Sequence, residues 1–466
     1  MSAKCTKKKS NSLPGALRNK AFECGELIVK ATPYAHVISM SQNAKYCDWC
    51  ALPPKAGKLR KCSACQYEHY CDQQCQKGAW KYHKFECALL KARMPLVPAD
   101  NVRLLTKILW NIGQGIVQAK DDPGWRVWND LCHHSNVIRT DEERSRQFRE
   151  TSSTVLQYVG AQKMKQYGMQ SAADMLPEFG RMVFNGYTLI YLDSEMVGAA
   201  VYVSPSMFNH SCAPNAAHTT IGTTLYIRAL RDIDTAKEEI LVNYIDPMSS
   251  RQSRQDVLWK DYYFHCECSK CSDESGEASL ESFICPFCEG DVVKMSGGNP
   301  LCLQCRKSME DVKYLASCEK AAVDANKLSA DALKVKDMNI NLLKDFVSTN
   351  HLLSQRNVNL TMVKYNLYAM FSEQGDNAAA YKLGEELFEL FKLYYPEVYP
   401  LHGAHQVKQA RLAWHLDKYD KALVHYRTAL RLLIKTHGST HPLTKTAKSD
   451  VIECERDQFI YNKIVM

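Results

Sequence analysis

Apolar residues recur at helical spacing over two long parts of the chain, residues 97–180 and residues 311–466. Apolar positions three and four residues apart fall on one face of a helix. A second pattern of this kind runs through residues 147–162, so both parts are predicted to be mainly helical. The clearest pattern consists of Leu104, Leu105, Ile108, Leu109, Ile112 and Ile116.

Short β-prone runs bounded by turn residues lie outside these helical parts. Residues 25–30 predict a turn followed by a short strand, and residues 225–227 predict another strand. Residues 221–224 contain a glycine and predict a hairpin turn. Residues 240–244 predict a strand that ends on a tyrosine. The combination of short strands with helical blocks predicts an α+β fold.

A repeat with a period of 42 residues is visible near the C-terminal end of the sequence. Small residues at helix crossings and a proline after each helix pair are typical of TPR-like helical hairpins. So few repeats are also compatible with a structural cap. The matching positions are Ala380 and Ala422, Leu390 and Leu432, Pro400 and Pro442, and Leu401 and Leu443.

The composition is that of a globular protein, with 45% hydrophobic and 24% charged residues. The 466 residues allow about two to four domains. No apolar run approaches the roughly 18 residues that span a bilayer, and no signal-peptide core follows the basic start, so we expect an intracellular protein. The net charge of +8 is compatible with acidic partners without identifying them. Lys4 and residues 7–9 form a basic head, which is either a solvated terminus or a nuclear-targeting or nucleic-acid patch.

Twenty cysteines at close spacings predict zinc binding rather than disulfides in such a protein. Residues 47–87 hold eight potential ligands, which suit two tetrahedral zinc ions. The last two ligand pairs are each four residues apart, so each pair falls on one face of a helical turn. The eight ligands are Cys47, Cys50, Cys62, Cys65, Cys71, Cys75, His83 and Cys87.

A second group of cysteines, Cys266, Cys268 and Cys271, supplies only three ligands. Tetrahedral zinc needs a fourth. Cys212 is the natural donor, and a zinc ion there would tie residues 266–271 to the central part of the chain.

Cysteines also form two CxxC pairs in residues 276–310, thirteen residues apart. This spacing alone predicts a ribbon-like zinc site, preceded by a polar linker at residues 272–277. The ribbon ligands are Cys285, Cys288, Cys302 and Cys305. We expect the five remaining cysteines to be plain thiols: Cys5, Cys24, Cys132, Cys318 and Cys454.

The most concentrated polar cluster is Asn209-His210-Ser211-Cys212-Ala213-Pro214-Asn215, which is flanked by apolar and aromatic residues. Buried polar groups need hydrogen-bond partners, and each loses about 1–3 kcal/mol without one. Residues 209–215 therefore form either an exposed loop or a functional site.

Three segments in this order resemble the SET domain of protein lysine methyltransferases: residues 209–215, the run that ends on Tyr244, and residues 262–271 with their CxCxxC pattern. Residues 47–87 resemble a MYND finger, including the spacing from Trp80 to His83. A MYND finger within a SET domain is typical of the SET and MYND domain-containing (SMYD) family. The resemblance covers most of residues 1–271 and extends more weakly to the C-terminus.

The resemblance implies a β-rich SET domain with an inserted zinc finger and a helical insert, followed by a zinc-binding tail. It also implies interleaved ligand sets in the finger: Cys47, Cys50, Cys71 and Cys75 for one ion, and Cys62, Cys65, His83 and Cys87 for the other. The expected boundaries are 1–46 for the first part of the SET domain, 47–87 for the finger, 88–180 for the helical insert, 181–247 for the core SET domain, 248–275 for the post-SET tail, 276–310 for the ribbon and 311–466 for a TPR-like C-terminal domain.

The same resemblance implies site residues. A Gly-x-Gly-Leu loop usually lies against the cofactor, but here Pro14 and Ala16 take the glycine positions. A histidine satisfied inside a helical bundle is the alternative for His134, and core packing is the alternative for Tyr262 and Phe264. The implied residues are Tyr244 for catalysis; Gly15, His134, Asn185, Asn209, His210, Tyr244 and Phe264 for the cofactor; and Tyr187 and Tyr262 for the lysine tunnel.

The implied function is S-adenosylmethionine-dependent methylation of lysine in histone or non-histone proteins. The alternative is a zinc-rich scaffold or transcriptional co-regulator with a weak or inactive SET core. Three zinc ions are expected, and the ribbon predicts a fourth. The finger would dock a proline-rich peptide or be purely structural, and the C-terminal lobe would border the substrate groove. We expect a monomer in cytoplasm and nucleus that binds neither membrane nor, directly, nucleic acid.

Overall fold

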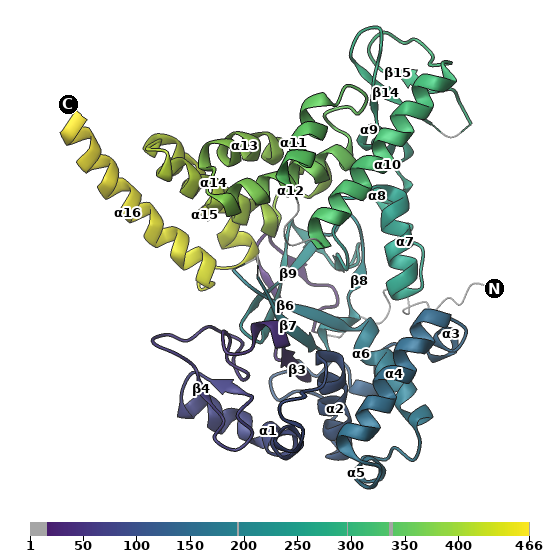
Figure 1. Cartoon of the computed structure of the whole chain (residues 1–466), viewed down its shortest axis with the longest axis vertical. Helices are drawn as coiled ribbons and strands as arrows, with labels where there is room; N and C mark the ends of the chain where they lie inside the picture. Colours follow the sequence, from purple (N-terminus) through teal and green to yellow (C-terminus); the bar gives the residue numbers. More distant parts are fainter. Residues whose placement is uncertain (1–15, 193–194, 296, 335–338, 466) are drawn as a thin grey trace. The chain divides into compact units, whose positions relative to one another are not determined.

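The computed structural model describes residues 16–192, 195–295, 297–334 and 339–465 (Figure 1). The chain divides into two compact units. The first unit consists of residues 1–209 and 216–240, and the second of residues 210–215 and 241–466. Gly15, Pro14 and the basic head fall outside the described residues, so their predictions stay untested.

Two three-stranded antiparallel sheets form the β part of the first unit. The side chain of Thr220 links the two sheets, because its Oγ1 donates to the backbone carbonyl of Ile190 at 2.9 Å. The strand order in one sheet is β2 (Leu27–Ala31), β10 (Thr224–Ala229), β9 (Ala216–Ile221). The order in the other sheet is β3 (Ala35–Ile38), β7 (Glu195–Val201), β6 (Gly186–Tyr191). Two short pairs complete the strands: β1 (Ala21–Phe22) with β11 (Ile233–Asp234), and β4 (Arg60–Lys61) with β5 (His69–Tyr70).

The predicted hairpin at residues 221–224 is confirmed, because it joins β9 to β10. The strands predicted at residues 25–30 and 225–227 are also confirmed, as β2 and β10, which pair with each other. Gly222 has a positive φ of 60°, and a Cβ on it would lie 2.1 Å from the carbonyl oxygen of Cys50. A glycine is therefore required both by the turn and by the close approach of the loop that contains Cys47 and Cys50.

Helices make up much of residues 73–184 of the first unit, and the prediction of a mainly helical segment at residues 97–180 is confirmed except at residues 114–134, which hold no α-helix. All members of the apolar pattern from Leu104 to Leu109 are buried. The second pattern is split, because Gly160 has a φ of 89° and ends one helix before the next begins. The helices are α1 (Gln73–Arg93), α2 (Asp100–Gly113), α3 (Ser135–Ile138), α4 (Glu142–Val159), α5 (Ala161–Gln166) and α6 (Leu176–Phe184).

The second unit begins with residues 210–215, which include the second residue of β8 (Asn209–His210), and with β12 (Leu241–Val242). The strand predicted at residues 240–244 is shorter than expected. The polar linker predicted at residues 272–277 is wrong, because Asp273 accepts a hydrogen bond from Gly276 N and caps a helix. The helices here are α7 (Arg251–Tyr262), α8 (Ser269–Ser272) and α9 (Glu274–Leu280).

A three-stranded antiparallel sheet follows, with β13 (Phe283–Ile284), β14 (Asp291–Val293) and β15 (Leu301–Cys302). Helices α10 (Val312–Lys334), α11 (Ile340–Thr349) and α12 (Val358–Gln374) come next. The chain then continues through α13 (Asn377–Tyr394), α14 (Pro400–His415), α15 (Tyr419–Thr436) and α16 (Pro442–Val465).

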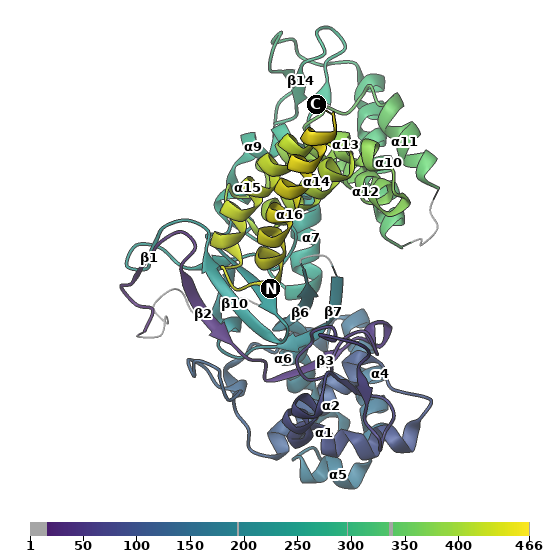
Figure 2. The ribbon, with the colours of Figure 1, turned by 90° about the vertical axis from the view of Figure 1, so that its left-hand side faces the viewer.

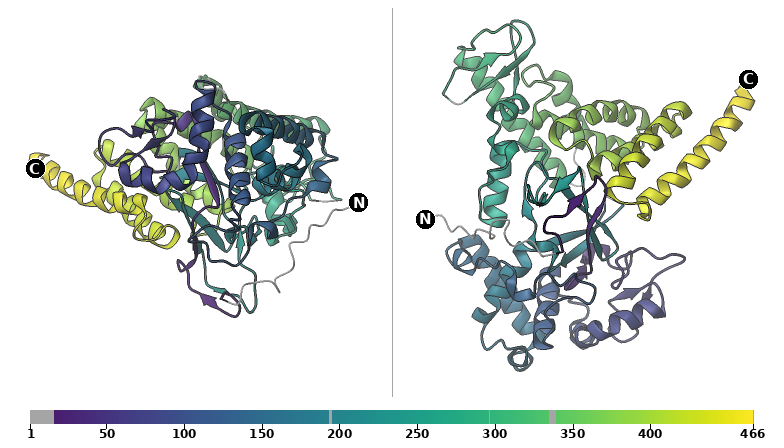
Figure 3. Two further views of the ribbon diagram at one scale, coloured as in Figure 1. Left: turned by 90° about the horizontal axis from the view of Figure 1, so that it is seen from below. Right: turned by 180° about the vertical axis from the view of Figure 1, so that it is seen from behind.

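The last four helices pack one against the next, as Figure 2 shows for α13 to α16. Helices α13 and α15 begin 42 residues apart, and so do α14 and α16, in agreement with the sequence repeat. Pro400 and Pro442 each open a helix, where a proline costs no hydrogen bond. Helix α16 closes the row, and its last turns extend beyond α15 (Figure 3).

The structure therefore combines β-sheets, a zinc-finger segment and a helical C-terminal region, in line with a mixed α and β fold. No helix among the described residues is both long and apolar enough to cross a membrane.

Candidate functional site

The structure gathers the eight potential ligands of residues 47–87 into two groups of four. Within each group, the ligand atoms lie within 4.8 Å of one another. The sulfurs of Cys50 and Cys71 are 3.7 Å apart, and those of Cys62 and Cys87 are 3.8 Å apart. The groups are Cys47, Cys50, Cys71, Cys75 and Cys62, Cys65, His83, Cys87, the interleaved sets that the resemblance implies.

Cys212 joins Cys266, Cys268 and Cys271 in a third group within the second unit. The sulfurs of Cys212 and Cys271 are 3.6 Å apart. Three of the four side chains are buried, and Leu258 of α7 packs with them. The chain thus supplies the fourth ligand that the CxCxxC tail lacks.

The ribbon cysteines form a fourth group, with 3.7 Å between the sulfurs of Cys285 and Cys305 and 3.5 Å between those of Cys288 and Cys302. Four ligands tetrahedrally arranged at about 2.3 Å from zinc lie about 3.8 Å apart, whereas disulfide sulfurs lie about 2.0 Å apart. All four groups therefore fit zinc and none fits a disulfide.

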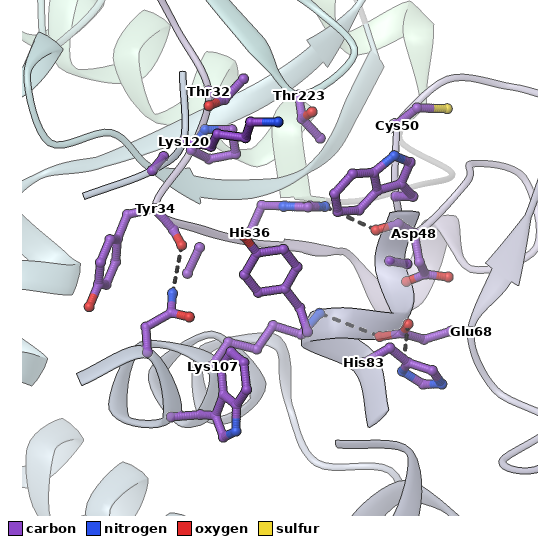
Figure 4. A pocket seen from close by; sticks show the side chains of 18 of the residues that line it. Thr32, Tyr34, His36, Asp48, Cys50, Glu68, His83, Lys107, Lys120 and Thr223 are labelled. Atoms are coloured by element: carbon purple, nitrogen blue, oxygen red, sulfur yellow. Dashed lines mark hydrogen bonds and ion pairs between the residues drawn. The ribbon is translucent and has the colours of Figure 1, made fainter. Parts of the chain in front are cut away.

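Buried charged side chains support the second finger group. Glu68 Oε2 lies 2.7 Å from His83 Nδ1, which leaves Nε2 of His83 facing Cys65 at 3.6 Å. A carboxylate on the outer ring nitrogen fixes the orientation and tautomer of a histidine ligand. Arg103 Nη2 in turn lies 3.0 Å from Glu68 Oε1. Lys107 Nζ lies 3.4 Å from the same oxygen (Figure 4). Burial would raise the pKa of the Glu68 carboxyl, but Lys107, His83 and Arg103 hold that pKa well below its usual value.

Arg254 plays a comparable part beside the Cys212 group. Its guanidinium is fully buried, and Nη2 lies 3.6 Å from Cys271 Sγ and 2.9 Å from Glu277 Oε1. Nη1 donates to the carbonyl of Ser249 at 2.6 Å. Four thiolates around one zinc carry a net charge of −2, so a buried cation at this distance offsets part of that charge.

Most residues of the central motif are buried or half-buried and only Ala213 is exposed, so the motif does not form an exposed loop. Ser211 N donates to the carbonyl of Val242 at 2.9 Å. Asn215 pairs with Leu241 in both directions, since Asn215 N donates to the Leu241 carbonyl at 3.2 Å and Leu241 N donates to Asn215 Oδ1 at 2.7 Å. These bonds hold residues 210–215 against the strand that leads to Tyr244.

His210 connects the third cysteine group with Tyr244. Tyr244 N donates to His210 Nδ1 at 2.9 Å, so Nδ1 is an acceptor. In a neutral imidazole the other nitrogen then carries the hydrogen. His210 Nε2 lies 3.2 Å from Cys212 Sγ and can donate to that sulfur. One imidazole thus holds both the ligand and the tyrosine backbone.

Aromatic rings surround Tyr244 in the second unit. The ring centroids of Tyr244 and Tyr262 are 5.0 Å apart, and those of Tyr244 and Phe264 are 6.5 Å apart at 89°. Phe264 and Tyr262 also pack against the Cys212 group, as the core-packing alternative predicts, and their roles at the cofactor and the lysine tunnel stay predictions. Burial, with Tyr244 and Asp261 nearby, raises the pKa of Tyr262 to about 12, so its hydroxyl stays neutral.

Two residues of the helical C-terminal region reach this part of the second unit. Tyr395 OH donates to Oδ1 of Asp246 at 2.6 Å, and Asp246 lies two residues after Tyr244 in the sequence. Lys270 Nζ donates to the carbonyl of Tyr394 at 2.9 Å. Lys270 lies between Cys268 and Cys271 in the sequence. The helices therefore brace the segments on which Tyr244 and the third cysteine group lie.

In the first unit, the structure brings His134 and Asn185 into neighbouring segments. Asn185 ends α6, and its Nδ2 donates to the carbonyls of Cys132 and Arg181, each at 2.9 Å. The ring of His134 lies 4.8 Å from that of Phe184. His134 has a φ of 46°, a conformation that costs energy for a residue other than glycine.

Two further predicted residues of the first unit have defined partners. Tyr187 lies on β6, and its hydroxyl donates to the carbonyl of Pro205 at 3.2 Å. Its ring lies 5.4 Å from that of Tyr202. Asn209 Nδ2 donates to Glu239 Oε1 at 2.5 Å. No role was predicted for Glu239, Glu68 or Arg254, because the residues that they contact lie far from them in the sequence.

Comparison with known proteins agrees with the geometry. Residues 47–87 match the MYND finger family. The chain is 25% identical over 435 residues to the human (Homo sapiens) protein named histone-lysine N-methyltransferase SMYD3, with 92% of each chain covered. It is 26% identical over 449 residues to N-lysine methyltransferase SMYD2-A of Xenopus laevis, with 94% of this chain and 96% of the other covered. The chain belongs to the SMYD family.

The similarity spans more than the finger. Human histone-lysine N-methyltransferase SMYD1 is 27% identical over 481 residues, which cover 97% of this chain and 90% of the other. The SMYD resemblance therefore extends through the helical C-terminal region, further than residues 1–271, where the motifs made it strongest.

Proposed function

We propose that this SMYD protein is an S-adenosylmethionine-dependent protein-lysine N-methyltransferase with a SET-type catalytic centre. The observation that carries the proposal is the connection from the Cys212 group through His210 to Tyr244, with Tyr262 and Phe264 around the tyrosine. A scaffold without activity would not need a tyrosine held this way. The names of the relatives support the same reaction class.

Methyl transfer to lysine requires an uncharged amine, because an ammonium group has no lone pair. When bound, S-adenosylmethionine supplies a methyl group on a positively charged sulfur. The lysine amine would accept this methyl group as the bond from the methyl carbon to sulfur breaks, and the surplus proton of the methylated amine would pass to solvent. Burial beside aromatic rings lowers the pKa of an amine and so favours its neutral form.

Tyr244 would orient the amine through its hydroxyl, and alignment of this kind contributes several kcal/mol to catalysis. Tyr262 and Phe264 supply aromatic faces, which attract a sulfonium or a methylated ammonium group. In this proposal Phe264 contacts the cofactor and Tyr262 contacts the lysine side chain. His210 holds the backbone of Tyr244 and also contributes to cofactor binding.

The cofactor roles of His134, Asn185 and Asn209, and the tunnel role of Tyr187, remain predictions for the first unit. Each can be tested by its effect on the dissociation constant of S-adenosylhomocysteine. Gly15 remains a prediction as well.

Four zinc ions would serve structural roles, because each group already offers four ligands and so leaves no open position for a substrate. A protein with a target lysine is the proposed substrate. A proline-rich peptide at the MYND finger and residence in cytoplasm and nucleus are further parts of this proposal.

Two measurements test the function. The first is calorimetry of the zinc-loaded chain with S-adenosylhomocysteine. The second is transfer of labelled methyl groups from S-adenosylmethionine to mixed histones and to proteins of a cell extract. Binding followed by transfer to lysine supports the proposal. Absence of both would favour the alternative, a zinc-rich interaction scaffold.

A further inference from the structure

A cavity of about 360 Å³ lies within the first unit, beside the MYND finger (Figure 4). Its walls come from the start of β3, from α1 and α2, and from the loop that contains Cys47 and Cys50. None of the residues proposed for methyl transfer or cofactor binding lines it. The volume is within the range of small-molecule sites, about 300–1,000 Å³.

Aromatic side chains form much of the wall. The rings of Trp49 and Tyr82 are 6.2 Å apart with 22° between their planes, and those of Tyr82 and Trp110 are 5.9 Å apart at 75°. Phe85 stacks on Trp110 at 4.8 Å. The cavity therefore offers both ring faces and ring edges to a flat ligand.

One buried polar atom in this wall lacks a partner. Asn111 Nδ2 donates to the carbonyl of Tyr34 at 2.7 Å, which fixes the orientation of the amide. Asn111 Oδ1 is buried and has no hydrogen-bond partner among the described residues. The side chain is only 2% exposed. An unmatched buried acceptor costs about 1–3 kcal/mol, so a ligand with an N–H donor is favoured here.

Lys107 and Glu68, two charged groups of the wall, are already paired, and the wall also includes Lys120 and Asp121, whose charges are of opposite sign. Lys107 Nζ lies 3.4 Å from Glu68 Oε1 and 3.3 Å from Glu86 Oε2. His36 Nε2 lies 2.9 Å from the carbonyl of Asp48. Burial, aided by Lys107, lowers the pKa of His36 to about 4, so its ring is neutral at pH 7. An uncharged ligand fits this wall better than an ion.

We infer that the cavity binds an uncharged one- or two-ring heteroaromatic group that carries an N–H donor. The ring lies against Trp49 and Tyr82, and the N–H donates to Asn111 Oδ1. This inference stands apart from the proposed methyl transfer, because the two use different residues.

The first test needs no mutation. Indole and 1-methylindole are titrated by calorimetry into the zinc-loaded full chain, with and without saturating S-adenosylhomocysteine. The two compounds have nearly the same ring, but only indole has an N–H. We expect indole to bind at least 10-fold more tightly than 1-methylindole and to be unaffected by S-adenosylhomocysteine. Equal affinities, no binding of indole at millimolar concentration, or competition with S-adenosylhomocysteine would overturn the inference.

Matched variants on one helix provide the second test. Tyr82→Ala removes a wall of the cavity, whereas Trp80→Ala removes a side chain of α1 that is 47% exposed and does not line it. The zinc content of both variants verifies that the finger is folded. We expect Tyr82→Ala to weaken indole binding at least 10-fold and Trp80→Ala to change it less than twofold. Equal effects of the two substitutions would contradict the site.

The ring could belong to a free metabolite or to a tryptophan side chain of a partner protein. N-Acetyl-L-tryptophanamide distinguishes them, because it carries the same indole on a peptide-like backbone. Tighter binding than indole would support a tryptophan side chain, and weaker binding would support a free small molecule.

Discussion

Tyr244 N donates to His210 Nδ1 at 2.9 Å, while His210 Nε2 lies 3.2 Å from Cys212 Sγ. The predicted zinc ligand Cys212 and the proposed catalytic Tyr244 are thus linked by one imidazole. We therefore expect the position of Tyr244 to depend on the Cys212 group, although four predicted ligands would leave a zinc ion no open position for chemistry.

Removal of the tail zinc should consequently impair methyl transfer. We predict that Cys212→Ser lowers the zinc content by about one ion per chain and lowers the rate of methyl transfer at least 10-fold, because His210 then loses the sulfur that orients it toward Tyr244. Zinc content by mass spectrometry and label transfer measure the two effects. Cys288→Ser is the matched control: it removes a ribbon ligand, and we expect the same zinc loss with activity kept within twofold. Equal loss of activity in both variants would show that zinc acts only through general stability.

The buried guanidinium of Arg254 should stabilise the same zinc site. Its Nη2 lies 3.6 Å from Cys271 Sγ, so Arg254→Gln removes a positive charge beside four thiolates. We predict zinc release roughly 10-fold faster than in the wild type, followed with a chromogenic chelator. Arg251→Gln alters an exposed arginine on the same helix and should leave the release rate unchanged. Release at the wild-type rate in Arg254→Gln would contradict this role.

The helical C-terminal region should lose stability in mild acid. Burial lowers the pKa of His405 to about 4, and its Nε2 bonds to the carbonyl of Gly384 at 2.8 Å. The unfolded chain binds the proton at about pH 6.5, so the stabilising difference is fully present above pH 6.5 and is lost as the pH falls toward 4. From pH 7 to pH 5 the loss is about 2 kcal/mol.

Thermal unfolding at the two pH values tests this effect. His405→Gln should unfold with a smaller decrease in Tm between pH 7 and pH 5 than the wild type. His351→Gln, a change at an exposed histidine, should retain the wild-type decrease. An identical decrease in all three proteins would mean that His405 does not contribute.

Cysteine spacing was informative because ligands of one zinc ion often come in local pairs, and the structure brings the sixteen predicted side chains together in four groups of four. The period of 42 residues likewise located the starts of α13 to α16, since each repeat is one helical hairpin. In these cases chemistry or periodicity acts over short stretches of sequence.

Interactions between distant segments could not be predicted in this way. Glu68 and Arg103 meet only after folding, and so do Asn209 and Glu239. Local side-chain bonds also changed two elements. Asn243 Nδ2 donates to the carbonyl of Ile245 at 3.2 Å, which favours a turn just after β12, and the cap at residue 273 turned a predicted linker into α9.

Replacement of the Tyr244 hydroxyl is the most direct test of the account. Wild type and Tyr244→Phe are incubated with cell extract and labelled S-adenosylmethionine, and methylated lysines are identified by mass spectrometry. We predict that sites methylated by the wild type decrease at least about 100-fold with the variant, as when one aligned polar group is removed from an active site, while the affinity for S-adenosylhomocysteine stays within threefold. Equal methylation by both proteins would contradict the central claim that Tyr244 carries the reaction.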